Sequence, residues 1–310
     1  MLRCWKEEVG YNMKIAITGG TGFVGRVVTQ LLVEKGHEVY ILSRSVNKRT
    51  DNVTYIKWLT NDATPENDLT GIDAFINLAG ESINNGRWTS AQKKKIYNSR
   101  MQATEEVLRI IKTLKQKPKV LINASAIGIY PASNEKIYTE QSPEIGTDFL
   151  AKTVHDWEQK AKLAEKLGVR VAYGRFGIIL GKDNGALPLM ALPYKMFVGG
   201  PIGSGQNWMS WIHVKDVANA LLFAIEHDIH GPFNVTAPEP KKMKEFGREL
   251  AAVLKRPHYF FVPAFVLKMA LGEKSQLVLE GQQVMPEVLL ENGFIFEFPQ
   301  LPNALTDIYL

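Results

Sequence analysis

The feature that most constrains the fold is a glycine-rich turn between a short apolar strand and an amphipathic helix. Residues 14–18, KIAIT, form an apolar run typical of a buried strand and lead directly into GGTGFVG at 19–25. A helical pattern then runs to Lys35, stops at Gly36, and gives way to a second strand over 37–42. In this strand–turn–helix–strand context, a glycine pattern indicates a dinucleotide-binding site.

The glycines of this turn have separate expected roles. We expect Gly20 to permit the tight turn, Gly22 to let the backbone approach a pyrophosphate, and Gly25 to allow close packing of helix on strand. The phosphate would lie at the helix N-terminus, where free N–H groups and the helix dipole favour an anion. The whole predicted loop is Gly19, Gly20, Thr21, Gly22, Phe23, Val24 and Gly25.

The end of the second strand predicts which dinucleotide binds. NAD sites usually place an acidic residue there to hold the ribose 2′-hydroxyl. This chain has Ser43 and Arg44 instead, with Lys48 and Arg49 nearby. Because a cation and a hydroxyl suit a 2′-phosphate, we expect NADP as the cofactor.

Further strands and helices alternate along the chain. Strands are expected at 53–57, 74–78, 120–124 and 169–175, with helices around 90–114 and 148–167. This alternation predicts an α/β fold with a doubly wound parallel sheet of the Rossmann type and a smaller C-terminal domain. We expect an NADP-binding domain over 13–180, completed by about 214–235, and a substrate domain from 181–213 and 236–310, with the pocket between them.

Composition and charge narrow the partners. The 310 residues carry a net charge of +5, but the basic residues are scattered, so no nucleic-acid partner is expected. No run of about 18 apolar residues exists, so no membrane-spanning helix is expected, and FFVPAFVLKMALG at 260–272 is interpreted as core. Cys4 is the single cysteine, which excludes disulfides within the chain and fits the reducing cytoplasm. The expected partner is a small-molecule substrate, with no membrane contact, and the oligomeric state is open.

The first twelve residues do not continue into the predicted fold. They lack the apolar segment of a signal peptide. Back-translation of residues 6–9, KEEV, can give a purine-rich bacterial ribosome-binding sequence ahead of Met13. We therefore hypothesise that residues 1–12 are a non-native leader of a bacterial protein; the genomic codons test this.

Several motifs resemble those of the extended short-chain dehydrogenase/reductases, such as nucleotide-sugar epimerases. They are TGGTGFVG, NLAG, NASAIGIY, the TE at 139–140, GRFGIILG and WIHVKDV. Three longer segments resemble an atypical epimerase branch of unassigned activity that has its own C-terminal module: GRWTSAQKKKIYNSR, GGPIGSGQNWMSWIH and LVLEGQQVMPEVLLENGFIFEFP. The resemblance covers nearly the whole chain from Met13 onward.

The resemblance implies further cofactor contacts. The fourth strand is followed by Leu78, Ala79 and Gly80, and the first two would line the adenosine side. Arg100 would reach a cofactor phosphate, and Ile179 would lie near the nicotinamide. Without the resemblance, Arg100 would be interpreted as an exposed helix arginine.

The catalytic pair of the wider superfamily is missing. There, a tyrosine exchanges a proton with the substrate, a lysine four residues later lowers the tyrosine pKa, and a serine hydrogen-bonds the reacting oxygen. Ser125 occupies the serine position. At the start of the next predicted helix, however, stand Phe149 and Leu150, with Thr153 and Val154 at the lysine positions.

Other polar and aromatic groups are candidates for the pocket. Glu81 follows the cofactor-facing segment and, with Ser125, is a candidate catalytic residue. Arg87, Trp88 and Trp208 are candidate substrate contacts, although core or interdomain packing is an equally good interpretation of Trp208. The chain shows no metal-ligand spacing, so no metal site is expected.

The leading function hypothesis is an NADP-dependent oxidoreductase or epimerase-like protein that acts on a small polar substrate, such as a nucleotide-linked one. It would work without the usual Tyr-x-x-x-Lys pair. The alternative is a non-catalytic NADP-dependent redox sensor or binding protein. A structural or nucleic-acid-binding role ranks third.

Overall fold

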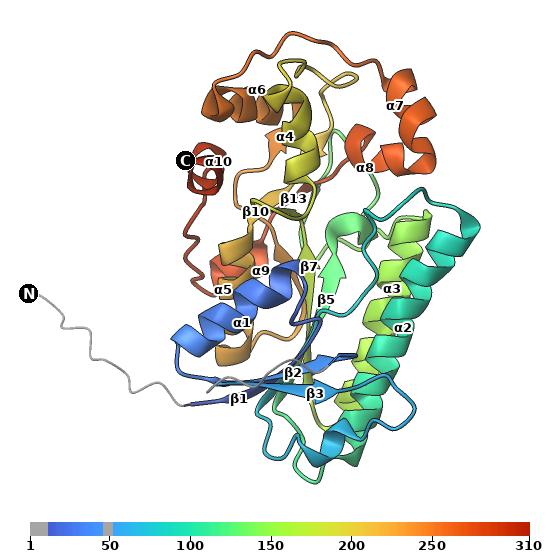
Figure 1. Cartoon of the computed structure of the whole chain (residues 1–310), viewed down its shortest axis with the longest axis vertical. Helices are drawn as coiled ribbons and strands as arrows, with labels where there is room; N and C mark the ends of the chain where they lie inside the picture. The colour runs from blue at the N-terminus through green and yellow to red at the C-terminus, as the bar shows by residue number, and fades with distance from the viewer. Residues whose placement is uncertain (1–11, 46–51) are drawn as a thin grey trace, which may run out of the picture.

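A seven-stranded sheet forms the centre of the computed structural model, which describes residues 12–45 and 52–310 (Figure 1). All paired strands run parallel, in the order β11-β7-β5-β4-β1-β2-β3. This confirms the predicted Rossmann-type α/β fold. The proposed leader, Cys4, Lys48 and Arg49 lie outside the described residues, apart from Asn12. The sheet strands are β1 (Lys14–Thr18), β2 (Glu38–Ser43), β3 (Val53–Lys57), β4 (Ala74–Asn77), β5 (Val120–Ala126), β7 (Arg170–Phe176) and β11 (Gly231–Val235).

Helices cover both faces of the sheet. On one face lie α1 (Phe23–Glu34) and α5 (Val214–Glu226); on the other lie α2 (Ser90–Thr113) and α3 (Phe149–Ala161). In β1, Ile15 and Ile17 belong to the first core and Ala16 to the second. Because successive side chains of a strand point to opposite faces, a sheet covered on both sides needs continuous apolar strands.

The strand order reverses at β1, which has β2 on one side and β4 on the other. In open α/β sheets, ligands bind in the crevice outside the carboxyl ends of the strands at this reversal. The loops after β1, β4 and β5 therefore meet where a ligand is expected.

The helix starts around this crevice are built differently. The Thr89 hydroxyl accepts the N–H of Gln92 at the start of α2, and the Asp148 carboxylate accepts the N–H of Ala151 at the start of α3. Helix α1 begins instead at Gly22, which has no capping side chain.

The remaining elements form the upper part of Figure 1 and return to the sheet. Leu180, Trp211, Phe246 and Leu305 belong to a separate apolar core there. The division into two domains stays a prediction. The helices are α4 (Leu187–Lys195), α6 (Met243–Leu254), α7 (Ala264–Leu271), α8 (Gln276–Leu279), α9 (Glu287–Glu291) and α10 (Leu301–Tyr309), and the short strands are β6 (Ile137–Tyr138), β8 (Ile178–Leu180), β9 (Trp208–Met209), β10 (Trp211–His213), β12 (Lys241–Lys242) and β13 (Gln283–Val284).

One sequence interpretation of this upper part is wrong. Segment 260–272 was expected to be core, yet none of the residues in α7 is buried. Phe260, Phe261 and Phe265 are all exposed. This apolar run is not a core, because the described parts of the chain leave these side chains uncovered.

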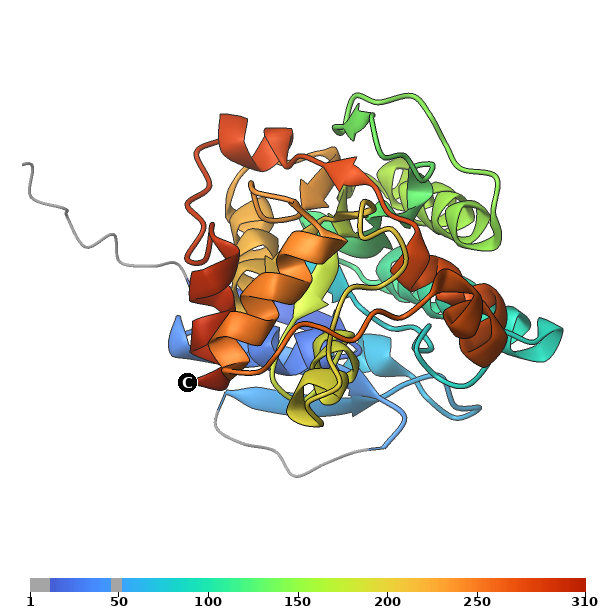
Figure 2. The ribbon, with the colours of Figure 1, turned by 90° about the horizontal axis from the view of Figure 1, so that it is seen from above.

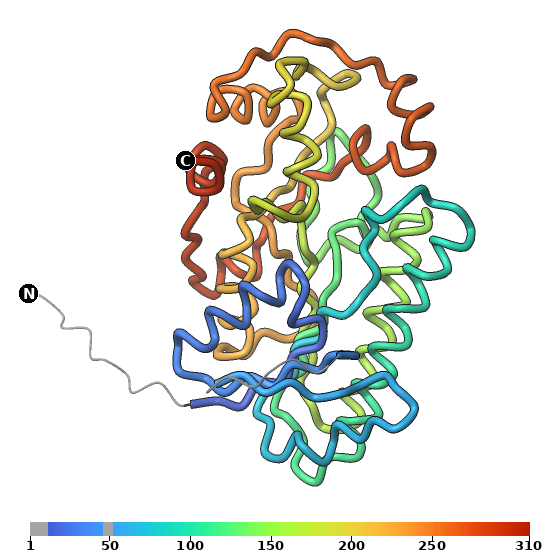
Figure 3. Tube along the Cα trace, viewed as in Figure 1, coloured from blue at the N-terminus to red at the C-terminus, as the bar shows by residue number. Residues whose placement is uncertain are grey.

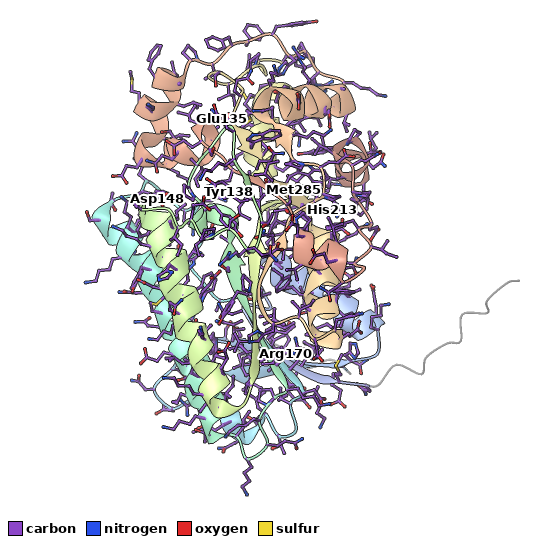
Figure 4. All side chains as sticks on the ribbon, turned by 180° about the vertical axis from the view of Figure 1, so that it is seen from behind. Glu135, Tyr138, Asp148, Arg170, His213 and Met285 are labelled. Atoms are coloured by element: carbon purple, nitrogen blue, oxygen red, sulfur yellow. The ribbon has the colours of Figure 1, made fainter. Side chains whose placement is uncertain are left out.

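The C-terminal chain returns along the sheet, as the tube in Figure 3 shows. Strand β13 pairs with β6, and the N–H of Met285 donates to the Tyr138 carbonyl at 2.9 Å (Figure 4). Further on, the Asp216 carboxylate accepts the N–H groups of Glu297 and Phe298. These contacts anchor the C-terminal segment from β13 onward to the larger part of the molecule.

Candidate functional site

The glycine turn after β1 is tighter than its sequence predicted. Gly19 has φ of +70° and adopts the left-handed conformation, so the turn depends on Gly19 and not on Gly20. A Cβ on Gly19 would lie 2.8 Å from the Leu78 carbonyl carbon, and a Cβ on Gly20 would lie 2.9 Å from the Ile41 side chain. The assignment of the tight turn to Gly20 was therefore wrong, and Gly20 instead leaves room for β2.

Gly22 and Gly25 serve different purposes in the same loop. A Cβ on Gly25 would lie 2.2 Å from the Gly19 carbonyl oxygen, so only glycine lets α1 pack on the loop backbone. A Cβ on Gly22 would meet only the Gly19 carbonyl oxygen, at 3.1 Å, and would otherwise face open space. With no side-chain cap and no acidic residue in the first turn, the start of α1 offers its N–H groups and positive dipole to an anion.

The next two loop residues point into the protein. Val24 packs against the core under α1. The Phe23 ring lies against Gly181, where a Cβ would be 2.5 Å from the ring, and beside Gly185. A Cβ on Gly185 would also lie 2.9 Å from the Ile179 carbonyl oxygen, so Phe23 connects the loop to β8. The backbone of Ile179 thus lies near the Phe23 ring of the loop, and its contact with the nicotinamide stays a prediction.

The segment after β4 is held by a buried polar network. The Thr18 hydroxyl donates to Asn77 at 2.6 Å and accepts the N–H of Ala79 at 3.3 Å. Asn77 donates in turn to Thr104 and Asn123. Because these groups satisfy one another, Leu78 and Ala79 are fixed beside the glycine turn.

Arg100 lies directly beneath this segment. Its guanidinium donates to the carbonyls of Glu81 and Ile96, both at 3.0 Å, and lies 5.1 Å from the Trp157 ring centre. A Cβ on Gly80 would be 3.2 Å from it. Burial lowers the pKa of Arg100 to about 10, so it stays charged at neutral pH. Arg100 is therefore not the exposed helix arginine of the alternative interpretation.

A cation that the sequence interpretation missed is Arg26. It donates to the Thr21 carbonyl at 3.0 Å. Together with Gly20 and Thr21, it lines a cavity of about 570 Å³ between α1 and the β2–β3 edge. Ser43 ends the neighbouring strand β2, and the exposed Arg44 follows it. A basic residue directly after the last glycine was the available signal.

Ser125 does not face open space. It is 2% exposed, and its hydroxyl donates to the Glu158 carboxylate on α3 at 2.5 Å. That carboxylate also binds Arg175 on β7 through two hydrogen bonds of 2.8 Å. The expected role of Ser125 at a reacting oxygen is therefore not supported by the geometry, because its proton is already committed to a buried carboxylate.

The network continues to the far side of the sheet end. Arg175 donates to the Tyr130 hydroxyl at 2.9 Å, and this hydroxyl lies 2.9 Å from Oδ1 of Asn234. The N–H of Asn234 donates to Glu140 at 2.7 Å. Burial raises the pKa of Tyr130, so it holds its proton at neutral pH and is a poor base. Tyr130 therefore has a structural role, and Tyr138 stacks on it with ring centres 5.1 Å apart.

The start of α3 is apolar where a catalytic pair would stand. The Phe149 ring meets Trp88 edge-on at 5.9 Å, and Nζ of Lys93 lies 5.5 Å from its centre. The Thr153 hydroxyl donates to the Phe149 carbonyl, and Val154 is in a buried apolar cluster. The positions where the superfamily has its tyrosine and its lysine therefore offer no group that exchanges a proton with a substrate.

The remaining candidates are spread over several loops. Glu81 accepts a hydrogen bond from Asn85 at 2.8 Å, and Arg87 donates to the Ala270 carbonyl at 3.2 Å. Trp88 is 8% exposed and donates to Ile83, which favours packing. Trp208 donates to Asn134 on another loop. The structure thus brings Glu81 next to Arg100, whereas no described contact joins Trp208 to Arg87 or Trp88.

Two absences concern residues 12–45 and 52–310 only. Within them, no group of three His, Cys, Asp or Glu side chains is placed to hold a metal ion. No helix in the same ranges is both long and apolar enough to cross a bilayer.

The chain is similar to known proteins over almost its full length. Epimerase family protein YfhF of Bacillus subtilis (strain 168) is 50% identical over 298 residues, which are 96% of this chain and 98% of that protein. The crystal structure of human epimerase family protein SDR39U1 (isoform2) with NADPH has a TM-score of 0.85 and 34% identity, and covers 96% of this chain and 99% of that chain. A nucleoside-diphosphate sugar epimerase from Corynebacterium glutamicum has a TM-score of 0.76 and 29% identity, and covers 96% of this chain and 58% of its own.

Two family matches divide the sequence. Residues 262–308 match a domain of unknown function, DUF1731, which is the C-terminal module expected from the resemblance. Residues 15–236 match the NAD dependent epimerase/dehydratase family. With a match over more than half its length, and with the glycine loop, the sheet and the C-terminal module in place, the chain belongs to the NAD-dependent epimerase/dehydratase family.

Proposed function

We propose that this protein binds NADP(H) at the glycine loop and exchanges a hydride with a small polar substrate, such as a nucleotide-linked one. The observation that carries the proposal is the open, uncapped start of α1 at Gly22, with Arg26 beside it and no acidic residue in its first turn. The similar human protein whose structure contains NADPH supports the choice of NADP.

The residues present fit this cofactor. The space next to Gly22 suits a pyrophosphate, and Arg26 and Arg44 offer positive charge for a 2′-phosphate. The bound cofactor would supply a hydride donor or acceptor. The residues that we propose to hold it are Gly19, Gly20, Thr21, Gly22, Phe23, Val24, Gly25, Arg26, Ser43, Arg44, Leu78, Ala79, Gly80, Arg100 and Ile179.

The proton that accompanies hydride transfer needs another source than the usual tyrosine. Ser125 and Tyr130 are bound into the Glu158–Arg175 network, and Phe149 has no proton to exchange. Glu81 is partly exposed beside Arg100, and its carboxylate accepts a hydrogen bond from the Asn85 amide. We propose Glu81, acting directly or through water, as the group that moves the proton, with Arg87 as a substrate contact.

The alternative is a redox sensor that binds NADP(H) without turnover. The apolar start of α3 favours it specifically, since Phe149 and Val154 stand where the superfamily has a tyrosine and a lysine, and both pack among apolar side chains. Glu81→Gln separates the two functions. It should abolish substrate turnover if Glu81 moves the proton and change nothing if the protein only reports cofactor occupancy.

The first test is calorimetric titration of the full chain with NADPH and NADH. NADPH should bind more tightly, and Arg44→Asp should weaken it by more than tenfold, because a charge-assisted hydrogen bond contributes about 1.5–3 kcal/mol. The matched control is Arg248→Asp, an exposed arginine on α6 away from the loop. Preference of the wild type for NADH would exclude the NADP assignment. Absorbance of NADPH during a screen of carbonyl and nucleotide-sugar metabolites then tests for turnover.

A further inference from the structure

The upper end of the molecule carries an exposed apolar surface that the cofactor site does not use. It is formed by α4, by the connection before α7, and by α7 itself (Figure 1), and Figure 2 views this end of the molecule from above. Each of its side chains is between 41% and 82% exposed. We call it the apical surface: Leu189, Leu192, Met196, Phe197, Val198, Tyr259, Phe260, Phe261, Phe265, Val266 and Met269.

The two segments of the apical surface are bound side by side. The N–H groups of Tyr259 and Phe260 both donate to the Gly199 carbonyl, at 3.0 and 3.2 Å, and Val262 donates to Pro201 at 2.9 Å. A Cβ on Gly200 would lie 2.3 Å from the Phe260 carbonyl oxygen, so the chains touch through their backbones. The two segments that carry the exposed side chains are therefore held together where their backbones meet.

The size of this surface calls for a partner. Its five aromatic side chains are 55% to 82% exposed, which amounts to on the order of 600 Å² at roughly 200 Å² per ring. The six aliphatic and methionine side chains add to this. The largest apolar patch of an ordinary monomer is about 300–600 Å², and it is often functional.

Within the two segments that carry the surface, every charged residue is basic, and Asp183 and Glu273 stand at the borders of these segments. Segments 184–204 and 255–272 together contain Lys195, Lys255, Arg256 and Lys268 and no aspartate or glutamate. Lys195, Lys255 and Lys268 are exposed, and Arg256 lies over the Phe197 ring at 4.5 Å. Basic side chains with long aliphatic stems can thus surround an apolar contact while their charges remain in water.

We propose that the apical surface docks on an anionic lipid bilayer, with its aromatic and methionine side chains in the interface and its four cations against the headgroups. Aromatic and aliphatic side chains combined with lysine or arginine characterise segments that lie in a membrane interface, and anionic headgroups attract each nearby cation. This is a peripheral contact, which needs no membrane-spanning helix. It revises the expectation, from overall composition, of no membrane contact.

A second copy of the chain fits the charges less well. In a two-fold dimer the same patch faces itself, so the four cations of one copy would approach the four of the other without an acidic partner from either segment. Like charges that meet across an interface oppose association. An anionic surface removes this conflict, and for this reason we favour the bilayer.

Co-sedimentation of the full chain with vesicles tests the proposal. Vesicles of phosphatidylcholine with equimolar phosphatidylglycerol should bind the protein at least tenfold more strongly than pure phosphatidylcholine vesicles, since each cation near an anionic surface contributes about fivefold. The double variant Phe261→Ser/Phe265→Ser should lose at least tenfold in binding. Lys268→Glu should weaken binding to the anionic vesicles alone, about fivefold or more.

The matched control is Ile295→Ser, which removes an 86% exposed isoleucine outside the apical surface and should leave vesicle binding unchanged. Unchanged NADPH affinity in every variant would show that the site is intact, so failure here and failure of the cofactor proposal are distinguishable. Equal binding to both vesicle types, or no binding, overturns the proposal. A dimer in sedimentation equilibrium that the serine variant dissociates, without vesicle binding, would instead show that a second copy covers the surface.

Discussion

The loop after β1 and the end of β5 lie at the same edge of the sheet, with only β4 between them, yet they are built on opposite plans. In the loop, backbone groups face the expected phosphate, and the space next to Gly22 is open. The end of β5 is filled with side chains, and Ser125, Glu158 and Arg175 satisfy one another there. One place is arranged to receive an anion, and the other is closed on itself.

This difference shows that cofactor binding and proton exchange depend on separate parts of one fold. A phosphate needs free N–H groups and room, which a short glycine-rich segment can supply by itself. Proton exchange needs a side chain with a free position and a suitable pKa. At the end of β5 the polar side chains are bound to one another, so the cofactor end can work even where the usual reaction end does not.

The largest expected effect comes from a substitution in the Ser125–Glu158–Arg175 network at the end of β5, which we call the closed end. Glu158→Ala leaves Arg175 buried without its carboxylate, and removing one partner of a buried ion pair costs about 3–5 kcal/mol of unfolding free energy. The double variant Glu158→Leu/Arg175→Leu should recover much of this loss, because no buried charge remains. Urea unfolding measures both. A Glu158→Ala protein as stable as the wild type would show that the network does not hold this end together.

The next largest effect comes from filling the space beside Gly22 in the loop after β1, which we call the open end. Gly22→Val should weaken NADPH by more than a hundredfold, because the side chain enters the space where the pyrophosphate would lie and two or more hydrogen bonds of about 1.5 kcal/mol are lost. The φ of Gly22 is −77°, so a side chain there causes no backbone strain and the chain should fold. Calorimetry with urea unfolding measures both properties.

A matched pair isolates the role of space at the open end. Gly22→Ala and Gly128→Ala each add one methyl group at a glycine outside the left-handed region. The methyl on Gly128 would meet only Leu150, at 3.8 Å. Only Gly22→Ala should reduce NADPH affinity. Equal affinities for the pair would mean that the loop is a turn and not a phosphate site.

A smaller effect concerns pH. Burial raises the pKa of Glu140 above its usual 4.5. The hydrogen bond from the N–H of Asn234 lowers this pKa because it favours the charged form, but burial has the larger effect. The folded state therefore holds this proton more strongly than the unfolded state. Its contribution to stability is present at low pH and is lost as the pH rises through the folded pKa. Glu140→Gln should remove this loss, so thermal midpoints of variant and wild type should diverge in the variant's favour as the pH rises from 4 to 7. Parallel midpoints would place Glu140 outside the titrating groups.

The sequence predicted the open end far better than the closed one. The strands, the helix from Phe23 and the glycine loop depend on neighbours in sequence, so local patterns located them. Only the role of Gly20 was wrong, because the choice of Gly19 for the turn depends on how closely the Leu78 backbone passes.

The closed end depends on residues far apart in the chain. Ser125, Glu158 and Arg175 come from β5, α3 and β7, and no spacing in the sequence reveals that they meet. The one available signal was a charged Arg175 inside an otherwise buried strand, which requires a partner. The prediction that segment 260–272 is core was wrong for a related reason. Hydropathy alone does not distinguish a buried core from an exposed apolar surface.

The smallest expected effect is the one that tests the comparison most directly. We expect that Phe149→Tyr with Thr153→Lys, and Leu150→Tyr with Val154→Lys, will not create carbonyl reductase activity. A phenol at Phe149 would lie between Trp88 and Lys93, and Ser125, whose proton goes to Glu158, could not share the substrate oxygen with it. A lysine at Thr153 or Val154 would place a cation at a buried position, which costs stability. Phe149→Tyr alone avoids that cost and keeps the test valid if the paired variants fail to fold. The measurement is NADPH oxidation with a panel of small carbonyl compounds, with NADPH affinity as the control. Turnover by any of these variants would show that the end of β5 kept a catalytic geometry and lacks only the acid, and the contrast between the two ends would then be one of a single missing hydroxyl.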